Sequence, residues 1–502
     1  MTRAIEKASS LLDIQEILKQ ASYFQNKASD PRSHIWVGAS AGTGKTKVLT
    51  DRVLRLMLPA ENHVATDPTR ILCITFTKAA AAEMASRIQS ILADWVSLDD
   101  TVLRDKIFAL TQEDVSDDIL KQARQLFARV VDEGARMKIM TIHGFCESVL
   151  KRFPIEAGLS PDFELIDERQ SREMLEHVID DLFSSKAQEL NNEELNEAIE
   201  FLSTHLDENG FKDLMKRVIS ERSDFSRFIR DVGGLSESIK TVYQYNKFDN
   251  TFVSKEGIED IFIQKCDWPR LNRCAELLCS GGKKEQDIGQ KLLIACQNVK
   301  EGKSPFPILE TVFLTTQYTR RAHPFAKKTQ ENFPDESLFF DDIADRFIDV
   351  LETLKRLRQA QATKALLVLG YVIIQGYEAQ KKNNSYLDFD DLIMKTSALF
   401  SSSNQAAWVL YKLDGGIDHI LIDEAQDTSP DQWAVIHAIT QEFFSGESRY
   451  ESFIKRTLFV VGDEKQSIYS FHKADPAKFQ EMKQFFKEQI SALEDELVVV
   501  PL

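Results

Sequence analysis

Residues 35–46 read Ile35-Trp36-Val37-Gly38-Ala39-Ser40-Ala41-Gly42-Thr43-Gly44-Lys45-Thr46. An apolar run typical of a strand leads into a loop of small residues, and apolar residues then recur at helical spacing until Pro59. This order predicts a strand, a phosphate-binding loop and a helix. Small residues let backbone N–H groups close around phosphate oxygens, while Lys45 reaches the β- and γ-phosphates and the Thr46 hydroxyl holds Mg²⁺. The pattern has one departure, since Ala39 stands where the first glycine is expected.

The size and charge of the chain set limits on its class. Its 502 residues are enough for about three domains. The net charge of −17 argues against a wholly basic coat around nucleic acid, although it leaves room for a local basic groove. The N-terminus lacks the apolar segment of a secretory signal, and the longest apolar run, residues 365–374, is too short to span a bilayer. We therefore expect a cytoplasmic protein without a membrane partner.

The cysteines do not indicate a metal site or a disulfide framework. There are six, and none forms a C-x-x-C pair. Cys266, Cys274 and Cys279 come closest to a cluster, but their spacing matches no zinc or iron–sulfur pattern. We expect them to be reduced thiols.

Strands and helices alternate at both ends of the chain, whereas its middle reads as helical. Further β-favouring runs are expected at residues 71–75, 138–141, 419–423, 457–461 and 496–500. Strands separated by helices imply a parallel sheet with right-handed crossovers, so the expected fold class is α/β. Residues 166–384 are charged, leucine-rich and mostly helical. We therefore expect one α/β domain formed by residues 1–165 and 385–502, interrupted by a helical subdomain at 166–384.

Two acidic residues follow one of these strands directly. Asp423 and Glu424 lie where the carboxyl end of a parallel strand faces the ligand crevice, beside the phosphate loop. There Asp423 can hold Mg²⁺ and Glu424 can polarise the attacking water. The alternative is an ordinary acidic helix N-terminus, which the helix dipole favours. The phosphate loop makes the catalytic interpretation the stronger one.

Two glutamines carry amides suited to a nucleotide. Gln25 precedes the first strand, and its amide can both donate to and accept from an adenine edge. Gln466 follows the strand at 457–461 and can sense a γ-phosphate. For Gln25 the alternative is simple surface solvation.

Aromatic residues also follow the strands. Phe76 and His143 each come directly after a predicted strand, and Tyr469 and Phe471 lie among polar and basic residues. Aromatic rings in such a setting suit stacking on unpaired bases. The alternative is core packing for the Phe and Tyr side chains and an ordinary loop position for His143. Their shared placement on one sheet edge favours a stacking groove.

Together these segments resemble the first ATP-binding lobe of the UvrD-like superfamily 1 DNA helicases. Pieces of seven motifs occur in the family's order: Gln25 and residues 39–46, 75–84, 141–145, 387–392, 423–427 and 461–474. The amino-acid sequence of residues 36–46 and 141–146 is most similar to the corresponding segments of the AddA subunits of the AddAB helicase–nucleases, which process double-strand breaks.

This resemblance implies a RecA-like P-loop NTPase domain, numbered 1A, with a large 1B-type helical insertion. It implies ATP and Mg²⁺ as ligands, with Lys45 on phosphate, Thr46 and Asp423 on the metal and Glu424 as general base, while Gln466 couples the γ-phosphate to DNA. The implied nucleotide-binding set is Gln25, Ala39, Ser40, Ala41, Gly42, Thr43, Gly44, Lys45 and Thr46. The implied DNA-binding set is Phe76, Thr77, His143, Tyr469 and Phe471.

The resemblance further implies 3′ to 5′ movement on single-stranded DNA, action at double-stranded DNA ends, a role in repair and recombination, and an AddB-like partner. At two positions this sequence departs from the pattern of the family, which weakens the arginine contacts that the resemblance would otherwise imply there. His472-Lys473 stands where many relatives have Arg-Gly, and Lys47 stands where many have Arg.

The sequence stops where motif IV of the family begins, so the second RecA-like lobe, its arginine finger and the nuclease are absent from it. An arginine finger supplies a factor of about 10³–10⁵ in hydrolysis. We therefore expect this chain alone to bind ATP and single-stranded DNA, to hydrolyse ATP poorly and not to unwind DNA. The alternative is a non-catalytic ATP- and DNA-binding module that depends on a partner chain for the second motor lobe.

Overall fold

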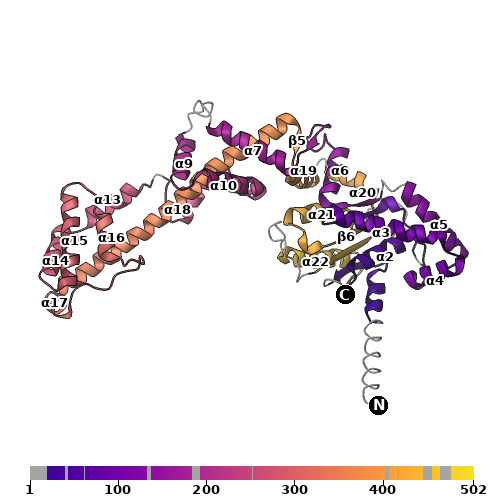
Figure 1. Ribbon diagram of the computed structural model, residues 1–502, viewed down its shortest axis with the longest axis horizontal. Helices are drawn as coiled ribbons and strands as arrows, with labels where there is room; N and C mark the ends of the chain where they lie inside the picture. Colours follow the sequence, from indigo (N-terminus) through magenta and orange to yellow (C-terminus); the bar gives the residue numbers. More distant parts are fainter. Residues whose placement is uncertain are drawn as a thin grey trace, which may run out of the picture. The chain divides into compact units, whose positions relative to one another are not determined.

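The computed structural model describes residues 20–39, 43–61, 63–132, 137–183, 193–251, 253–401, 406–414, 416–444, 455–463 and 476–502. By its contacts the chain divides into two compact units. The first is made of Met1–Glu168 together with Asn383–Leu502, and the second of Arg169–Lys382 (Figure 1). The domain limits expected from the sequence, and the labels 1A and 1B, stay predictions.

A six-stranded parallel sheet forms the centre of the first unit. Its strands are β1 (His34–Gly38), β2 (Ile71–Thr75), β3 (Lys138–Thr141), β6 (His419–Ile422), β7 (Thr457–Gly462) and β8 (Leu497–Pro501). They lie in the order β3-β2-β6-β7-β1-β8, and every neighbouring pair is parallel. The α/β class with a parallel sheet is therefore confirmed, and each expected strand is present to within one residue at either end.

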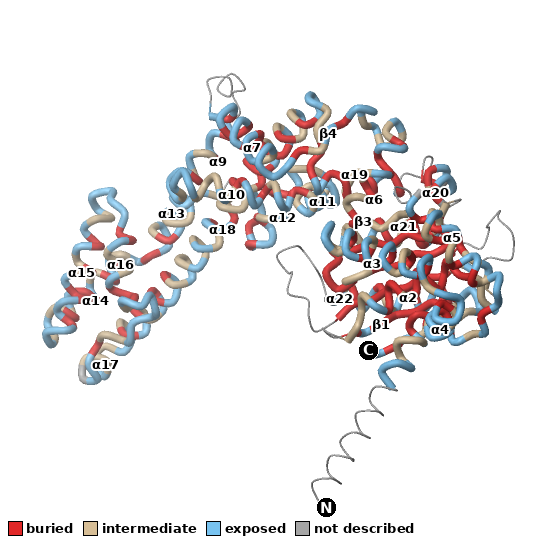
Figure 2. The backbone as a smooth tube through the Cα atoms, turned by 45° about the vertical axis from the view of Figure 1, so that its right-hand side comes forward, coloured by how far each residue is buried: buried red, intermediate tan, exposed pale blue. Residues whose placement is uncertain are grey.

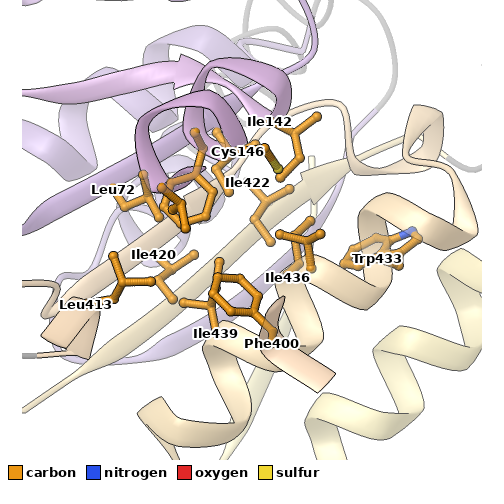
Figure 3. Packing of buried hydrophobic residues seen from close by; sticks show 14 of the residues in the cluster. Leu72, Ile142, Cys146, Phe400, Leu413, Ile420, Ile422, Trp433, Ile436 and Ile439 are labelled. Atoms are coloured by element: carbon orange, nitrogen blue, oxygen red, sulfur yellow. The ribbon is translucent and has the colours of Figure 1, made fainter. Parts of the chain in front are cut away.

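The two faces of this sheet are both covered, as a parallel sheet requires. Successive residues of one strand point to opposite faces. On β6, Ile420 and Ile422 join one hydrophobic core, while Leu421 joins the other. Figure 3 shows the first core, where Ile420 and Ile422 gather with Ile436 and Ile439 of the covering helix. In Figure 2 the buried residues concentrate along the strands and on the inner sides of the helices.

The helices that cover the sheet connect its strands. They are α2 (Lys45–Met57), α3 (Lys78–Ser97), α4 (Asp100–Thr111), α5 (Asp117–Asp132), α6 (Ile142–Arg152), α19 (Phe389–Ser401), α20 (Ala406–Asp414), α21 (Pro430–Phe443) and α22 (Pro476–Ser491). Short 3₁₀ turns, η1 (Pro68–Arg70) and η2 (Ala425–Asp427), precede β2 and follow β6. A two-stranded parallel pair, β4 (Glu164–Leu165) with β5 (Tyr386–Leu387), joins the two halves of this unit next to where the second unit begins and ends.

Threonines cap the helices that follow two of the strands. The Thr77 hydroxyl accepts a hydrogen bond from Ala80 N at 3.0 Å, and the Thr141 hydroxyl accepts one from Gly144 N at 3.1 Å. Such N-caps satisfy backbone donors that a helix end leaves without a partner. Helix α3 therefore begins at Lys78, and His143 lies in the first turn of α6 rather than at an ordinary loop position.

A buried arginine holds the amino-terminal ends of the central strands. Arg52 of α2 is 0% exposed and donates to Asp30 O, to Ser33 O and to the Thr457 hydroxyl. The Thr457 hydroxyl also lies 2.7 Å from His419 Nδ1, and His419 Nε2 lies 3.0 Å from the Thr66 hydroxyl, so both ring nitrogens are hydrogen-bonded. Burial lowers the pKa of His419 well below its usual value, which keeps the ring neutral.

We predict that Arg52→Met destabilises the first unit. The change removes the donor to the carbonyl oxygens of Asp30 and Ser33 and to the buried Thr457 hydroxyl, so the free energy of unfolding falls by about 3 kcal/mol. Urea unfolding followed by tryptophan fluorescence measures the loss. Arg87→Met, at an exposed site of α3, is the control and changes stability by less than about 0.5 kcal/mol. Equal effects of the two substitutions would contradict this account of Arg52.

The second unit is built from helices. They are α7 (Glu168–Phe183), α9 (Glu193–Ser203), α10 (Glu208–Ser220), α11 (Arg222–Val232), α12 (Leu235–Tyr245), α13 (Lys255–Lys265), α14 (Trp268–Cys279), α15 (Lys283–Lys300), α16 (Phe306–Phe313), α17 (Lys327–Asn332) and α18 (Pro334–Asn384). The helical character expected for residues 166–384 is confirmed. One core of this unit packs Phe306 and Phe313 against Phe347, with ring centroids 5.3 Å apart in each pair.

Helix α18 spans 51 residues and would extend about 77 Å if straight. Its fully buried residues fall into two groups, one ending at Phe347 and the next beginning at Leu357. Among the residues that the structure describes, no helix combines the length and the apolarity that crossing a bilayer requires.

Candidate functional site

The carboxyl ends of the parallel strands meet at one edge of the sheet. Gly38 at the end of β1 is aligned with Gly462 at the end of β7, and β7 in turn lies beside β6. Ala39 N donates to Gly462 O at 3.0 Å, which ties the start of the phosphate loop to the end of β7. The segments that follow β1, β6 and β7 therefore emerge side by side, as a ligand crevice in an open α/β sheet requires.

The two charged ends of this site touch each other. Lys45 Nζ lies 2.9 Å from Glu424 Oε2, although 379 positions separate the residues. The Lys45 side chain is 12% exposed and that of Glu424 is 34% exposed. Sequence reasoning put both residues at one triphosphate, and the structure brings them into direct contact. A cation facing an acid at the start of a helix is an arrangement that a phosphate group can enter.

Asp423 lies behind this ion pair. Its backbone N–H donates to Ile74 O at 2.9 Å, and its Oδ1 accepts from Glu424 N at 3.0 Å. Burial and the neighbouring Glu424 raise the pKa of Asp423 to about 6, and Lys45 opposes the rise. Glu424 has φ +48°, in the left-handed region that non-glycine residues rarely adopt. A turn held in that conformation aims two successive carboxylates at the same edge of the sheet.

The phosphate loop leads into α2 through a glycine whose backbone conformation would strain any other residue. Gly44 has φ +94°, and a Cβ there would lie 2.9 Å from Gln25 Nε2. Gly44 is also the N-cap of α2, and a glycine has no side chain to cap the helix. The amides of the first turn of α2 thus face the loop, next to Thr46. Ala39 is buried among apolar residues, so the core occupies the space around its methyl group.

Ser40, Ala41 and Gly42 of the predicted loop lie outside the described residues, and so do Gln466, Tyr469 and Phe471. Gln25 is described, at the end of a helix that covers residues 20–28. Its Nε2 donates to Thr43 O at 3.3 Å, and its Oε1 accepts from Lys47 Nζ at 3.1 Å. The adenine-binding candidate therefore lies against the phosphate loop.

The two described aromatic candidates, Phe76 and His143, lie in the other half of the same sheet edge. Phe76 is half-buried at the end of β2, and Thr77 is exposed beside it while its hydroxyl caps α3. His143, at the end of β3, meets Phe389 edge to face, with ring centroids 5.7 Å apart. Phe389 is 41% exposed. It belongs to a segment that the motif comparison included, but the sequence alone assigned it no role.

Gln426 is the second residue that sequence reasoning missed. It lies in η2, two positions after Glu424, and is 3% exposed. Its amide contacts Glu424 and the end of β7 at once. No local pattern could reveal this, because one of the partners lies 37 positions away.

We predict that Asp423→Asn stabilises the protein in a pH-dependent way. Since the folded pKa of about 6 lies above the ordinary 3.8, the folded chain holds the proton more tightly than the unfolded chain does. The stability of the protein therefore falls as the pH rises between these values. The amide at position 423 cannot ionise, so Asp423→Asn removes this loss of stability. The expected gain in the free energy of unfolding is about 3 kcal/mol near pH 8, and it vanishes below about pH 4.

Urea unfolding at a series of pH values measures this gain. Asp105→Asn, at an exposed position of α4, serves as the control. A gain from Asp423→Asn that stays constant across the pH series would show that the carboxyl group does not titrate as described.

Comparison with known proteins adds a second line of evidence. The UvrD/REP helicase N-terminal domain family matches residues 21–487 of the chain. Among curated proteins, the chain is similar to subunits of ATP-dependent helicase/nucleases. The one from Latilactobacillus sakei subsp. sakei (strain 23K) is 26% identical over 494 residues, which cover 91% of this chain and 50% of that protein.

Two further relatives of the same description give the same result. The one from Clostridium botulinum (strain Alaska E43 / Type E3) is 26% identical over 480 residues, covering 89% of this chain and 35% of that protein. The one from Listeria monocytogenes serotype 4b (strain F2365) is 25% identical over 495 residues, covering 91% of this chain and 36% of that protein. The chain thus spans about a third to a half of the length of these curated relatives.

Proposed function

The chain belongs to the UvrD/REP helicase N-terminal domain family, and from this premise we propose that it is the ATP-binding motor portion of an ATP-dependent DNA helicase. The resemblance drawn from its motifs, to UvrD-like helicases and to the AddA-type helicase–nucleases, is confirmed by these matches. The observation that carries the proposal is the contact between Lys45 and Glu424. It joins the phosphate-loop lysine to the acidic pair at the carboxyl end of β6.

The residues present fit a magnesium–triphosphate ligand. The Thr46 hydroxyl and the Asp423 carboxylate are the oxygen ligands that Mg²⁺ prefers, and Gly44 supplies the open backbone at the phosphate loop. When bound, Mg²⁺ neutralises charge on the β- and γ-phosphate oxygens. Lys45 exchanges Glu424 for a phosphate oxygen, and the freed Glu424 orients a water and takes its proton as general base.

The DNA-binding part of the proposal rests on the aromatic half of the sheet edge. Phe76 and His143 offer ring faces to unpaired bases, with Phe389 supporting the imidazole edge to face. The proposed direction, 3′ to 5′, and the roles in double-strand-break repair and recombination follow from the family resemblance. The same holds for an AddB-like partner.

We predict that Lys45→Ala abolishes ATP binding, whereas Glu424→Gln retains or tightens it. The first change removes the cation that meets the phosphates, and the second frees Lys45 from its ion pair. Isothermal titration with Mg·ATP measures both, and any turnover should be lost in Glu424→Gln because the general base is gone. Lys106→Ala, on the exposed face of α4, is the control. Unchanged ATP affinity in Lys45→Ala would refute the nucleotide site.

We predict that Phe76→Ala and His143→Ala each weaken binding of a labelled thymidine oligonucleotide by about tenfold, since a stacked base contributes roughly 1–3 kcal/mol. Fluorescence anisotropy measures the dissociation constants. Phe108→Ala is the matched control, because Phe108 is an exposed aromatic residue of α4 that lines a depression with Pro59 and Ala60 beyond the C-terminal end of α2. If all three variants lose affinity equally, the stacking groove is not at this edge.

A further inference from the structure

Gln426 lies at the centre of a set of contacts that the proposed mechanism does not yet use. Its Nε2 donates to Glu424 Oε2 at 2.8 Å and to Asp427 Oδ2 at 3.1 Å, while its Oε1 accepts from Asp463 N at 2.9 Å. The side chain thus connects the acidic pair after β6 to the end of β7. A side-chain amide carries both a donor group and an acceptor oxygen, so it can make both kinds of contact at once.

These partners fix the orientation of the amide. A backbone N–H can only donate, so the oxygen of Gln426 must face Asp463, and the NH₂ group must therefore face the two carboxylates. The space around it is closed as well. A Cβ on Gly462 would lie 2.8 Å from Gln426 Oε1 and 2.9 Å from the ring of Phe479. Gln426 is therefore held in one position by strand β7.

The same carboxylate oxygen of Glu424 takes two donors, Lys45 Nζ at 2.9 Å and Gln426 Nε2 at 2.8 Å. A triphosphate competes for Lys45, and its binding leaves Glu424 without its cation. A partly buried carboxylate that loses a donor costs free energy, and a second donor on the same oxygen reduces that cost. Gln426 cannot follow Lys45 to the phosphate, because β7 and η2 hold it.

We propose that Gln426 is a positioning residue that keeps Glu424 hydrogen-bonded, and aimed, when Lys45 turns to the triphosphate. This inference rests on the proposed function, since it presumes a nucleotide at Lys45. Gln426 acts through Glu424 and does not itself touch the nucleotide. The competing explanation is a purely structural bridge, in which Gln426 serves only to hold the end of β7 through Asp463.

A double-mutant cycle on Mg·ATP affinity separates these two explanations. Gln426→Met keeps the volume of the side chain and removes its polar atoms. In the parent chain we expect it to raise the dissociation constant about tenfold, the usual effect of one lost hydrogen bond to a charged group. In a Glu424→Gln background there is no carboxylate at position 424 to lose its cation when Lys45 turns to the triphosphate, so the same change should cost less than about twofold.

A second substitution separates the contact with Asp463 from the contacts with the two carboxylates. Gln426→Glu retains an oxygen for Asp463 N but replaces the donor to Glu424 and Asp427 with a like charge. We expect a loss of ATP affinity greater than about tenfold, and we expect Glu424→Gln to reverse most of it, because the new amide at 424 can then donate to the new carboxylate at 426.

The control is Gln432→Met, the same substitution at a glutamine whose Oε1 instead accepts from Ser429 N in the first turn of α21. It should change the dissociation constant by less than about twofold. Thermal unfolding of each variant verifies that it is folded. If Gln426→Met unfolds the chain, the isosteric Gln426→Glu still separates the two explanations, because the loss of ATP affinity that it causes is or is not reversed by Glu424→Gln.

Equal losses from the Gln426 substitutions in the parent and Glu424→Gln backgrounds would overturn the positioning role in favour of the structural bridge, while leaving the proposed function intact. A parent chain that shows no saturable binding of Mg·ATP would overturn the proposed function itself, and this inference with it.

Discussion

The ion pair between Lys45 and Glu424 depends on the parallel register of three strands. Lys45 begins the helix that follows β1, and Glu424 follows β6, with β7 between the two strands. A parallel arrangement delivers all three strand ends to one edge. An antiparallel neighbour at any of these places would send one partner to the opposite edge, and no local adjustment of a loop could recover a distance of 2.9 Å.

The two edges of the sheet have different roles. At the amino-terminal edge, Arg52, Thr457 and His419 form a buried series of hydrogen bonds that joins α2, β7 and β6. The two terminal nitrogens of Arg52 and the polar side-chain atoms of Thr457 and His419 have hydrogen-bond partners, while the buried Arg52 Nε has none among the described residues. At the carboxyl-terminal edge, Glu424 is held at a positive φ and Asp423 is held with a raised pKa. The strained backbone and the unfavourable charge thus lie at the edge where a ligand can bind and relieve them. The hydrogen bonds at the opposite edge hold the strands together.

The second unit owes its architecture to a different principle. Its helices bury apolar stripes against one another and against parts of α18, and its aromatic residues cluster around Phe347. Such packing needs only amphipathic periodicity, which is why residues 166–384 could be recognised as helical from their sequence. The same periodicity carries no information about which helices touch. The sequence therefore predicted the kind of structure in this unit, but not that a single helix of 51 residues runs along it.

The amino-acid sequence alone determined the features that depend on neighbours in the chain. These include the order of strand, small-residue loop and helix around Lys45, the limits of the strands, and the threonines placed to cap α3 and α6. Helix and strand periodicity, turn chemistry and capping act within a few residues, so the sequence contains them in full. The tertiary structure alone decided the strand order β3-β2-β6-β7-β1-β8, the burial of Arg52, the pairing of His143 with Phe389 and the two-sided contact of Gln426. Each of these joins groups that only the assembled sheet and its packed helices bring within reach, because hydrogen bonds and ring contacts act over a few ångströms, whatever the separation along the chain.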